Sequence, residues 1–361
     1  MRNHYKYKNK LPKHFTKKRP LYLNNVRKPI KAMWPVKTLI AVSLLLTLIL
    51  VVPTIVVIPF IKQQDPIQAV TEKLNNTSEE NVDEEETITV AVNRTKTEET
   101  DQVPLETYVV RVVASEMPTD FELEALKAQG LAARTYIVNH LMYQEDENIS
   151  DGELDQVYKD ETELRELWGE KYYANMEKIT EAVLATEGLI ITYNDKPITA
   201  AYFSTSNGYT ENSGEYWEHS LPYLKSVSSP WDEDSPKFLE QTIYTIEEVE
   251  SLLDIDLQDK VEMKLLRTDS GRVAQVIFGN NEFTGREVRE KLRLPSSDFS
   301  IKRNDEHFVF TTKGYGHGIG MSQYGANGMA QEGKTYEEII HHYYTDVKIQ
   351  SISDIGLDLF N

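Results

Sequence analysis

The sequence predicts an α+β fold, with mainly antiparallel strands packed with several helices and one transmembrane helix ahead of them. Short stretches of alternating polarity, such as TITVAV near Thr87, are typical of strands. VEMKLLRT and RVAQVIFG are joined by DSG, a turn that favours a hairpin. Capped, periodically apolar helix patterns alternate with these strands in no regular order, which favours α+β over a parallel sheet.

The composition of residues 1–61 predicts a membrane anchor. Residues 1–37 hold 12 of the 39 Lys and Arg residues and no acid, so the remaining chain carries 27 basic and 58 acidic residues. Residues 38–61 are uncharged and long enough to span a bilayer. The positive-inside rule then keeps the basic tail, 1–37, in the cytoplasm. We expect a single-pass protein of the cell membrane, with the acidic flexible stalk at 62–86, an extracytoplasmic domain at 87–350 and a C-terminal tail at 351–361.

Within the domain, the pattern predicts six helices and, with the first strand at 87–92, five strands. The first helix covers 104–117, and TDFE at 119–122 is a capping-box pattern that opens the second, which ends near Tyr143. The acidic stretch to about residue 165 is typical of a loop. Further helices are expected at 176–187, 245–253, 284–292 and 334–344, and the strands at 188–194, 197–205, 261–268 and 272–279.

Glu116, in RVVASEMP, lies where a helix normally carries an apolar residue. On a helical wheel it shares a face with Val109, Val112 and Val113, and Pro118 ends the helix just after it. Apolar neighbours and the negative end of the helix dipole both favour a protonated carboxyl, which can act as a general acid. Two structural alternatives are an ion pair with Arg134 and a frayed, hydrated helix end.

Two polar motifs supply candidate binding residues. KGYGHGIGMSQYGANGM (313–329) concentrates glycines around its His, Ser, Gln and Tyr side chains, although a tight structural turn would have the same composition. AYFSTSNGYTENSGEYW (201–217) offers hydroxyls, amides and aromatic rings, which suit a sugar. A nucleophile–base pair of Ser204 or Ser206 with His317 is the alternative use of these motifs.

Other functional classes have weaker support. GMAQEGKT (328–335) matches the phosphate-binding loop, but it lacks the preceding buried strand that such a loop requires. The basic tail directly precedes an apolar segment, which indicates a membrane and no nucleic acid. The chain has no Cys and no His pair at metal-ligand spacing, so we expect no metal and no cofactor.

LETYVVRVVASEMP, EALKAQGLAARTY, AYFSTSNGYTENSGEYW and GYGHGIGMSQYGANGMA, in this order, resemble the stage II sporulation protein D family, which includes the vegetative amidase enhancers. The resemblance covers about residues 86–350. It implies a peptidoglycan lytic transglycosylase that acts in forespore engulfment and cleaves MurNAc–GlcNAc bonds of denuded glycan strands. The Glu of SEMP, here Glu116, would act as acid and then as base, giving a 1,6-anhydro end. A hydrolase would need an activated water or a second carboxylate.

The resemblance also implies partners: the amidase stage II sporulation protein P, the membrane protein stage II sporulation protein M, and the membrane itself. Some relatives hold a metal with Cys and His before a Gln-x-Tyr; this chain keeps the Gln and Tyr alone, which predicts no zinc. The rival reading is a non-catalytic amidase enhancer or glycan-binding module in which Glu116 only pairs with Arg134. We expect the wall of the glycan site to comprise Arg134, Gln156, Tyr158, Tyr202, Ser204, Trp217, His317, Ser322, Gln323 and Tyr324.

Overall fold

The computed structural model describes residues 88–143, 148–152, 155–257 and 262–355, together with seven residues between Ile40 and Ile49. The basic tail, the stalk, most of the predicted span at 38–61 and residues 356–361 lie outside the described residues. Those seven residues are helical, and no helix among the described residues combines the length and the apolar run needed to cross a bilayer.

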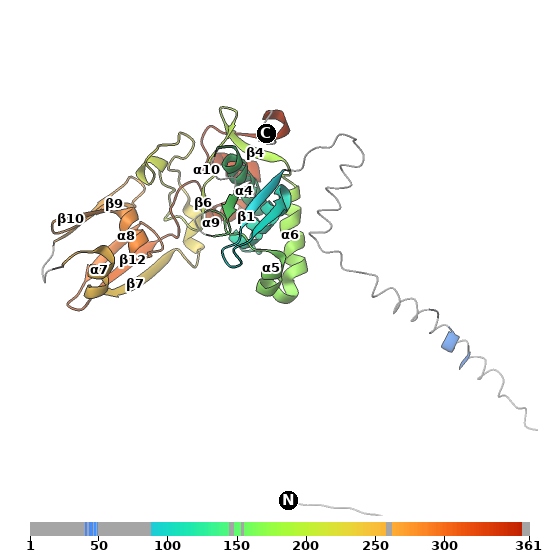
Figure 1. The fold of residues 1–361 in the computed structure, drawn as a ribbon, viewed down its shortest axis with the longest axis horizontal. Coiled ribbons are helices and arrows are strands. Elements are labelled where there is room, and N and C mark those ends of the chain that lie inside the picture. The colour runs from blue at the N-terminus through green and yellow to red at the C-terminus, as the bar shows by residue number, and fades with distance from the viewer. Residues whose placement is uncertain are drawn as a thin grey trace, which may run out of the picture. The chain divides into compact units, whose positions relative to one another are not determined.

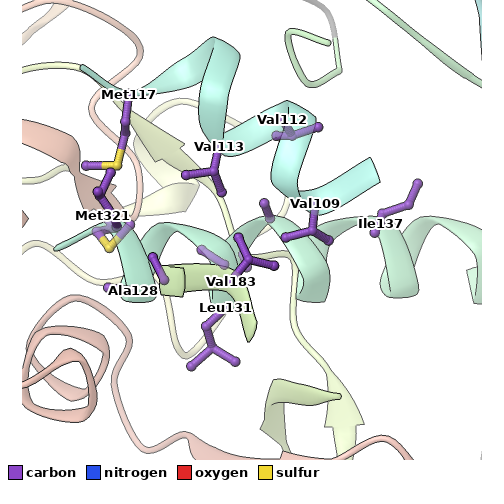
Figure 2. Packing of buried hydrophobic residues seen from close by; sticks show 14 of the residues in the cluster. Val109, Val112, Val113, Met117, Ala128, Leu131, Ile137, Val183 and Met321 are labelled. Atoms are coloured by element: carbon purple, nitrogen blue, oxygen red, sulfur yellow. The ribbon is translucent and has the colours of Figure 1, made fainter. Parts of the chain in front are cut away.

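Residues 88–355 form two hydrophobic cores, and Figure 1 shows the elements between residues 239 and 313 gathered around the second of them. The first core is mainly helical. Its helices are α3 (Leu105–Glu116), α4 (Leu123–Tyr143), α5 (Glu161–Trp168), α6 (Tyr172–Leu184), α9 (Gln323–Gln331) and α10 (Tyr336–Tyr343). Figure 2 shows Val109 and Val113 pointing from α3 toward α4.

Three small sheets accompany these helices. The first has β1 (Thr89–Asn93) between antiparallel β2 (Thr100–Pro104) and parallel β3 (Asn148–Ser150). The second has β4 (Leu189–Tyr193) between β5 (Lys196–Pro197) and β14 (Lys348–Ser351), both antiparallel. The third pairs β6 (Tyr202–Phe203) in parallel with β13 (Met321–Ser322).

The second core lies among two antiparallel sheets and two short helices. One sheet has the order β10 (Asn281–Thr284), β9 (Val273–Phe278), β8 (Met263–Arg267); the other has β11 (Phe299–Arg303), β12 (His307–Lys313), β7 (Leu239–Thr245). Its helices are α7 (Ile246–Leu253) and α8 (Gly285–Lys291). Short 3₁₀ turns complete the described chain at η1 (Gly169–Lys171), η2 (Ser213–Glu215), η3 (Pro230–Asp234) and η4 (Ser353–Ile355). The predicted mixed, mainly antiparallel α+β class is confirmed.

Local signals placed several helices correctly. Full capping boxes open α7, α8 and α10, at Thr245, Thr284 and Thr335. α3 ends at Glu116 because the following Met117 is extended, as a residue before proline prefers. The predicted hairpin of β8 and β9 around DSG is present.

Four local expectations were wrong. The strand expected at 197–205 is interrupted, because β5 ends at Pro197, β6 covers only Tyr202 and Phe203, and residues 198–201 lie in no strand. The TDFE pattern does not cap α4, because the N–H of Glu122 donates to the side chain of Asn327 in α9, 2.8 Å away. The acidic stretch before residue 165 contains α5, which a capping box at Asp160 and Glu163 opens. α6 begins at Tyr172, four residues before the predicted start. The errors at α4 and α5 come from a contact and a cap that apolar periodicity does not reveal. α6 follows η1 directly and has no side-chain cap that would mark its start.

Candidate functional site

Glu116 is the last residue of α3 and is half-buried. Its carboxyl oxygen Oε1 accepts a hydrogen bond from the backbone N–H of Val157, at 2.8 Å. Val157 belongs to the 155–160 segment, defined here as the described residues between Asp155 and Asp160, which leads into α5. The helix therefore delivers the carboxyl to a fixed backbone donor from a distant part of the chain.

A chain of neutral groups continues from this carboxyl. The hydroxyl of Tyr202 hydrogen-bonds to Glu116, and the same hydroxyl accepts from Gln156 Nε2 at 3.0 Å. Gln156 Oε1 in turn accepts from the hydroxyl of Tyr108, at 3.1 Å. Every member is uncharged, so the chain orients Glu116 without supplying a counter-ion.

Burial dominates the acidity of Glu116. Loss of hydration raises the pKa of this carboxyl above 4.5, and the donors Val157, Gln323 and Tyr202, with the more distant Lys159, only partly oppose that rise. None of these groups is another carboxyl. The protonated form is thus more favoured here than in an ordinary glutamate.

The glycine motif brings α9 to the same place. Ser322 caps the helix, and Gln323 begins it beside Glu116. Gln323 is 5 % exposed, and among the described residues its Nε2 makes no hydrogen bond of ordinary geometry. This amide lies beside the Glu116 carboxyl and favours its ionised form.

The two predicted motifs lie against each other through β6 and β13. Tyr202 is in register with Met321, and Phe203 with Ser322. Gly320 permits this approach: its φ is +77°, and a Cβ there would lie 2.0 Å from the carbonyl oxygen of Ala201. The spacing of the motif therefore encodes a close backbone contact next to the candidate acid.

His317 is held as a neutral ring. Its Nδ1 accepts from the N–H of Ile319 at 3.0 Å, and the ring makes its other bond to the backbone of Tyr202. Burial and the nearby guanidinium of Arg289 lower the pKa of His317 from 6.5 to about 3. The rings of Tyr216 and Trp217 lie 6.1 and 6.3 Å from it, centroid to centroid. His317 thus supports an aromatic cluster.

The geometry does not support a serine nucleophile. Ser206 is fully buried, and its hydroxyl donates to Asp232 and to the carbonyl of Ser229. Ser204 has its hydroxyl 3.3 Å from that of Thr205. Because both ring nitrogens of His317 are engaged, His317 does not serve either serine as a base.

Arg134 lies away from the candidate acid. It is fully buried, and Nε and Nη2 donate to the carboxylate of Glu106 at 2.7 and 2.6 Å. Further donation to the carbonyls of Val183 and Leu189 ties α4 to α6 and β4. Arg134 therefore pairs with Glu106, and the structural alternative in which it pairs with Glu116 is not observed.

The other predicted wall residues divide by exposure. Ser322 is fully buried and donates to Asp232, so it shapes the motif without facing a ligand. Tyr158 is also buried, stacked on Tyr108 at 5.6 Å. Tyr324, Tyr202 and Trp217 are half-buried and keep surface for a sugar.

The sequence patterns did not single out Tyr108 or the Val157 N–H. Tyr108 lies eight residues before Glu116, about two helical turns away on the same side of α3, so its position was a usable signal. Val157 contributes only its backbone N–H, so the identity of its side chain gives no sign of this role. No group of three or more His, Asp or Glu among the residues the structure describes is arranged to hold a metal ion.

Comparison with known proteins shows that the chain is similar to sporulation proteins. The family model described as "Stage II sporulation protein" matches residues 93–193, which contain Glu116 and Val157. Stage II sporulation protein D of Bacillus amyloliquefaciens is 47 % identical over 273 residues, covering 73 % of this chain and 79 % of the relative. The Bacillus subtilis (strain 168) protein of that name is 45 % identical over 270 residues, with the same coverage. An "Amidase enhancer" of Bacillus subtilis (strain 168) is 27 % identical over 296 residues, 66 % of this chain and 40 % of its own.

Proposed function

Because the chain belongs to the stage II sporulation protein D family, a family of sporulation proteins, we propose that it is a lytic transglycosylase of peptidoglycan. Its substrate would be denuded glycan strands, cleaved between MurNAc and GlcNAc during engulfment. One observation carries the proposal: Glu116 is a carboxyl of raised pKa that neutral donors hold, and the structure shows it in no ion pair with another described residue.

The reaction needs only this carboxyl. Protonated Glu116 gives its proton to the glycosidic oxygen as the bond from C1 of MurNAc to that oxygen breaks. The resulting carboxylate takes the proton of the C6 hydroxyl while O6 bonds to C1, which closes the 1,6-anhydro ring. No water is consumed, and Glu116 ends protonated as it began.

The surroundings of Glu116 suit both halves of this cycle. Burial favours the acid before bond cleavage, whereas the Val157 N–H and the Tyr202 hydroxyl stabilise the carboxylate that follows. A hydrolase would instead place a second carboxylate or an activated water opposite the acid. The groups that mainly set the Glu116 pKa include no such acid.

The half-buried aromatic side chains near His317 suit the sugar rings. Tyr216 and Trp217 can pack on the apolar faces of the glycan, with hydroxyl and amide groups nearby. We propose, from the family resemblance, that the domain is tethered outside the cell membrane. In that setting stage II sporulation protein P would strip stem peptides, and stage II sporulation protein M would be the membrane partner.

The test uses purified full-length chain and glycan strands that lack stem peptides. Wild type is expected to release fragments with anhydro-muramic ends, detected by mass spectrometry, and Glu116→Gln to release at least about 100-fold less. Glu122→Gln is the matched control, because Glu122 is exposed and its side chain makes none of the contacts described here. Equal release by wild type and Glu116→Gln would remove Glu116 from the chemistry.

A second candidate function follows from the amidase-enhancer relative. The chain would then bind glycan or an amidase and catalyse nothing. That function requires no cleavage by wild type, together with stimulation of amidase activity that Glu116→Gln retains. The same preparations distinguish the two functions.

A further inference from the structure

We propose that Arg94 is a positioning residue for the Glu116 site: its guanidinium fixes the 155–160 segment that presents the Val157 N–H and Gln156. The effect of Arg94 on catalysis rests on the proposed function. Its hold on the 155–160 segment, called the clamp below, rests on geometry alone. Arg94 follows β1 directly and is 7 % exposed. It touches none of the reacting groups itself.

The guanidinium of Arg94 faces four carboxylates from three parts of the chain. Nε donates to Asp151 at 2.9 Å, and Nη1 to Asp101 and Asp160 at 3.1 and 3.3 Å. Nη2 donates to Glu163. The guanidinium can bind all four carboxylates at once because it carries five N–H donors in a fixed fork.

Three of these carboxylates lie at the two ends of the 155–160 segment. Asp151 precedes it, just after β3, and Asp160 ends it as the N-cap of α5. Glu163 is in the first turn of α5 and completes the capping box with Asp160. Arg94 therefore holds both flanks of the stretch that contains Gln156 and Val157.

Arg94 also packs on the segment itself. Its Cζ lies 5.1 Å from the centroid of the Tyr158 ring, which stacks on Tyr108 of α3. Arg111, on α3, donates to the Tyr158 hydroxyl at 2.6 Å. The residue next to Val157 is thus fixed between two guanidiniums and the helix that carries Glu116.

The charges make this clamp strong and specific. Hydrogen bonds from Thr95 and Arg94 hold the pKa of Asp151 below 3.8, and those from Lys96 and Arg94 hold the pKa of Glu163 below 4.5, despite partial burial. Both are ionised at neutral pH. Without Arg94, four carboxylates would face one another, and among the described residues Lys96 would be the remaining cation in an ion pair with any of them, so the flanks would separate into water.

Separation of the flanks would move the groups that orient Glu116. Val157 would no longer donate to the carboxyl, and Gln156 would lose its bonds to Tyr108 and Tyr202. Displacement of a catalytic group by about 1 Å can cost about 100-fold in rate. The substrate contacts on β6 and α9 would remain, so binding should change little.

The test compares Arg94→Gln with wild type in the full-length chain, by amide hydrogen exchange and by strand cleavage. We expect the Val157 and Tyr158 amides to exchange at least about 10-fold faster, while those of β12 keep their rates. We expect kcat to fall about 10- to 100-fold, with KM changed less than about twofold. Asp151→Asn, which removes one arm and keeps the guanidinium, should show both effects more weakly.

Lys334→Gln is the matched control, since it removes one positive charge and a surface ion pair with Glu338 far along the chain. It should leave both readouts unchanged. Unchanged exchange at Val157 in both clamp variants would overturn the clamp. Faster exchange with an unchanged kcat would overturn the positioning role. If wild type cleaves no glycan, the proposed function fails, and the exchange rates still decide the clamp.

Discussion

At Glu116, burial and hydrogen bonding act on the same carboxyl in opposite directions. Burial raises its pKa, while the Val157 N–H and the Tyr202 hydroxyl lower it. Burial prevails, yet the donors keep the ionised form accessible. A group that must release a proton and take one back needs both forms within reach.

Replacement of Glu116 by Gln should stabilise the domain at neutral pH. A folded-state pKa above the unfolded value means that the contribution of Glu116 is full below the unfolded pKa, about 4.3, and is lost as pH rises through the folded pKa. Each unit between the two pKa values corresponds to about 1.4 kcal/mol. Urea unfolding from pH 4 to 8 should show the two proteins equal at the acid end and Glu116→Gln more stable at the other. A constant difference would contradict the burial of this charge.

His317 should control stability on the acid side. Its pKa is lowered to about 3 in the folded chain. Between about pH 6.5 and pH 3, His317 is therefore protonated in the unfolded chain and neutral in the folded chain. The contribution of His317 is therefore present above about pH 6.5 and is lost as pH falls toward 3. His317→Asn, which can still accept from Ile319, should flatten the loss of stability between about pH 6.5 and 4. Identical pH slopes for the two proteins would show that the ring is hydrated.

At the scale of elements, the contact between β6 and β13 depends on Gly320. Both Gly320 and Gly333 have a positive φ, but only Gly320 has a backbone atom where a Cβ would lie. Gly333→Ala should cost about 1 kcal/mol for the left-handed backbone alone. Gly320→Ala should cost about 3 kcal/mol or more, because the strands must also separate. Chemical denaturation measures both, and equal costs would contradict the close contact.

Local signals predicted elements well wherever the cause was local. The caps at Thr245, Thr284 and Thr335 needed only their own side chains, and the structure contains them. At Thr119 the same kind of pattern failed, because Asn327, far along the chain, satisfies the helix end instead. The apolar periodicity of a single segment cannot reveal a hydrogen-bond partner that lies far away in the sequence.

The candidate site shows the same division. Glu116 was identifiable because a charged residue on an apolar helix face violates the local pattern. The partner of Arg134 could not be identified from the sequence. Glu106 and Glu116 both lie on α3, and the packing of α4 against α3 decides which of them Arg134 binds. The backbone donor at Val157 has no signature in the sequence.

At the scale of the whole molecule, charge should contribute little to substrate binding. Outside residues 1–37 the chain has 27 basic and 58 acidic residues, which opposes long-range attraction to an anionic wall. Recognition should therefore rest on neutral contacts to sugars. The Kd for denuded glycan should change less than about twofold between about 0.05 M and about 0.5 M sodium chloride. A steep loss of affinity in salt would indicate charged contacts.

The proposed mechanism uses one carboxyl, that of Glu116, to break the glycan without water. The most direct measurement is digestion of denuded strands by the full-length chain in H₂¹⁸O, followed by mass spectrometry of the new ends. We predict 1,6-anhydro ends that are lighter by one water than hydrolysed ends and carry no ¹⁸O. Reducing ends that contain ¹⁸O would show a hydrolase and contradict the account.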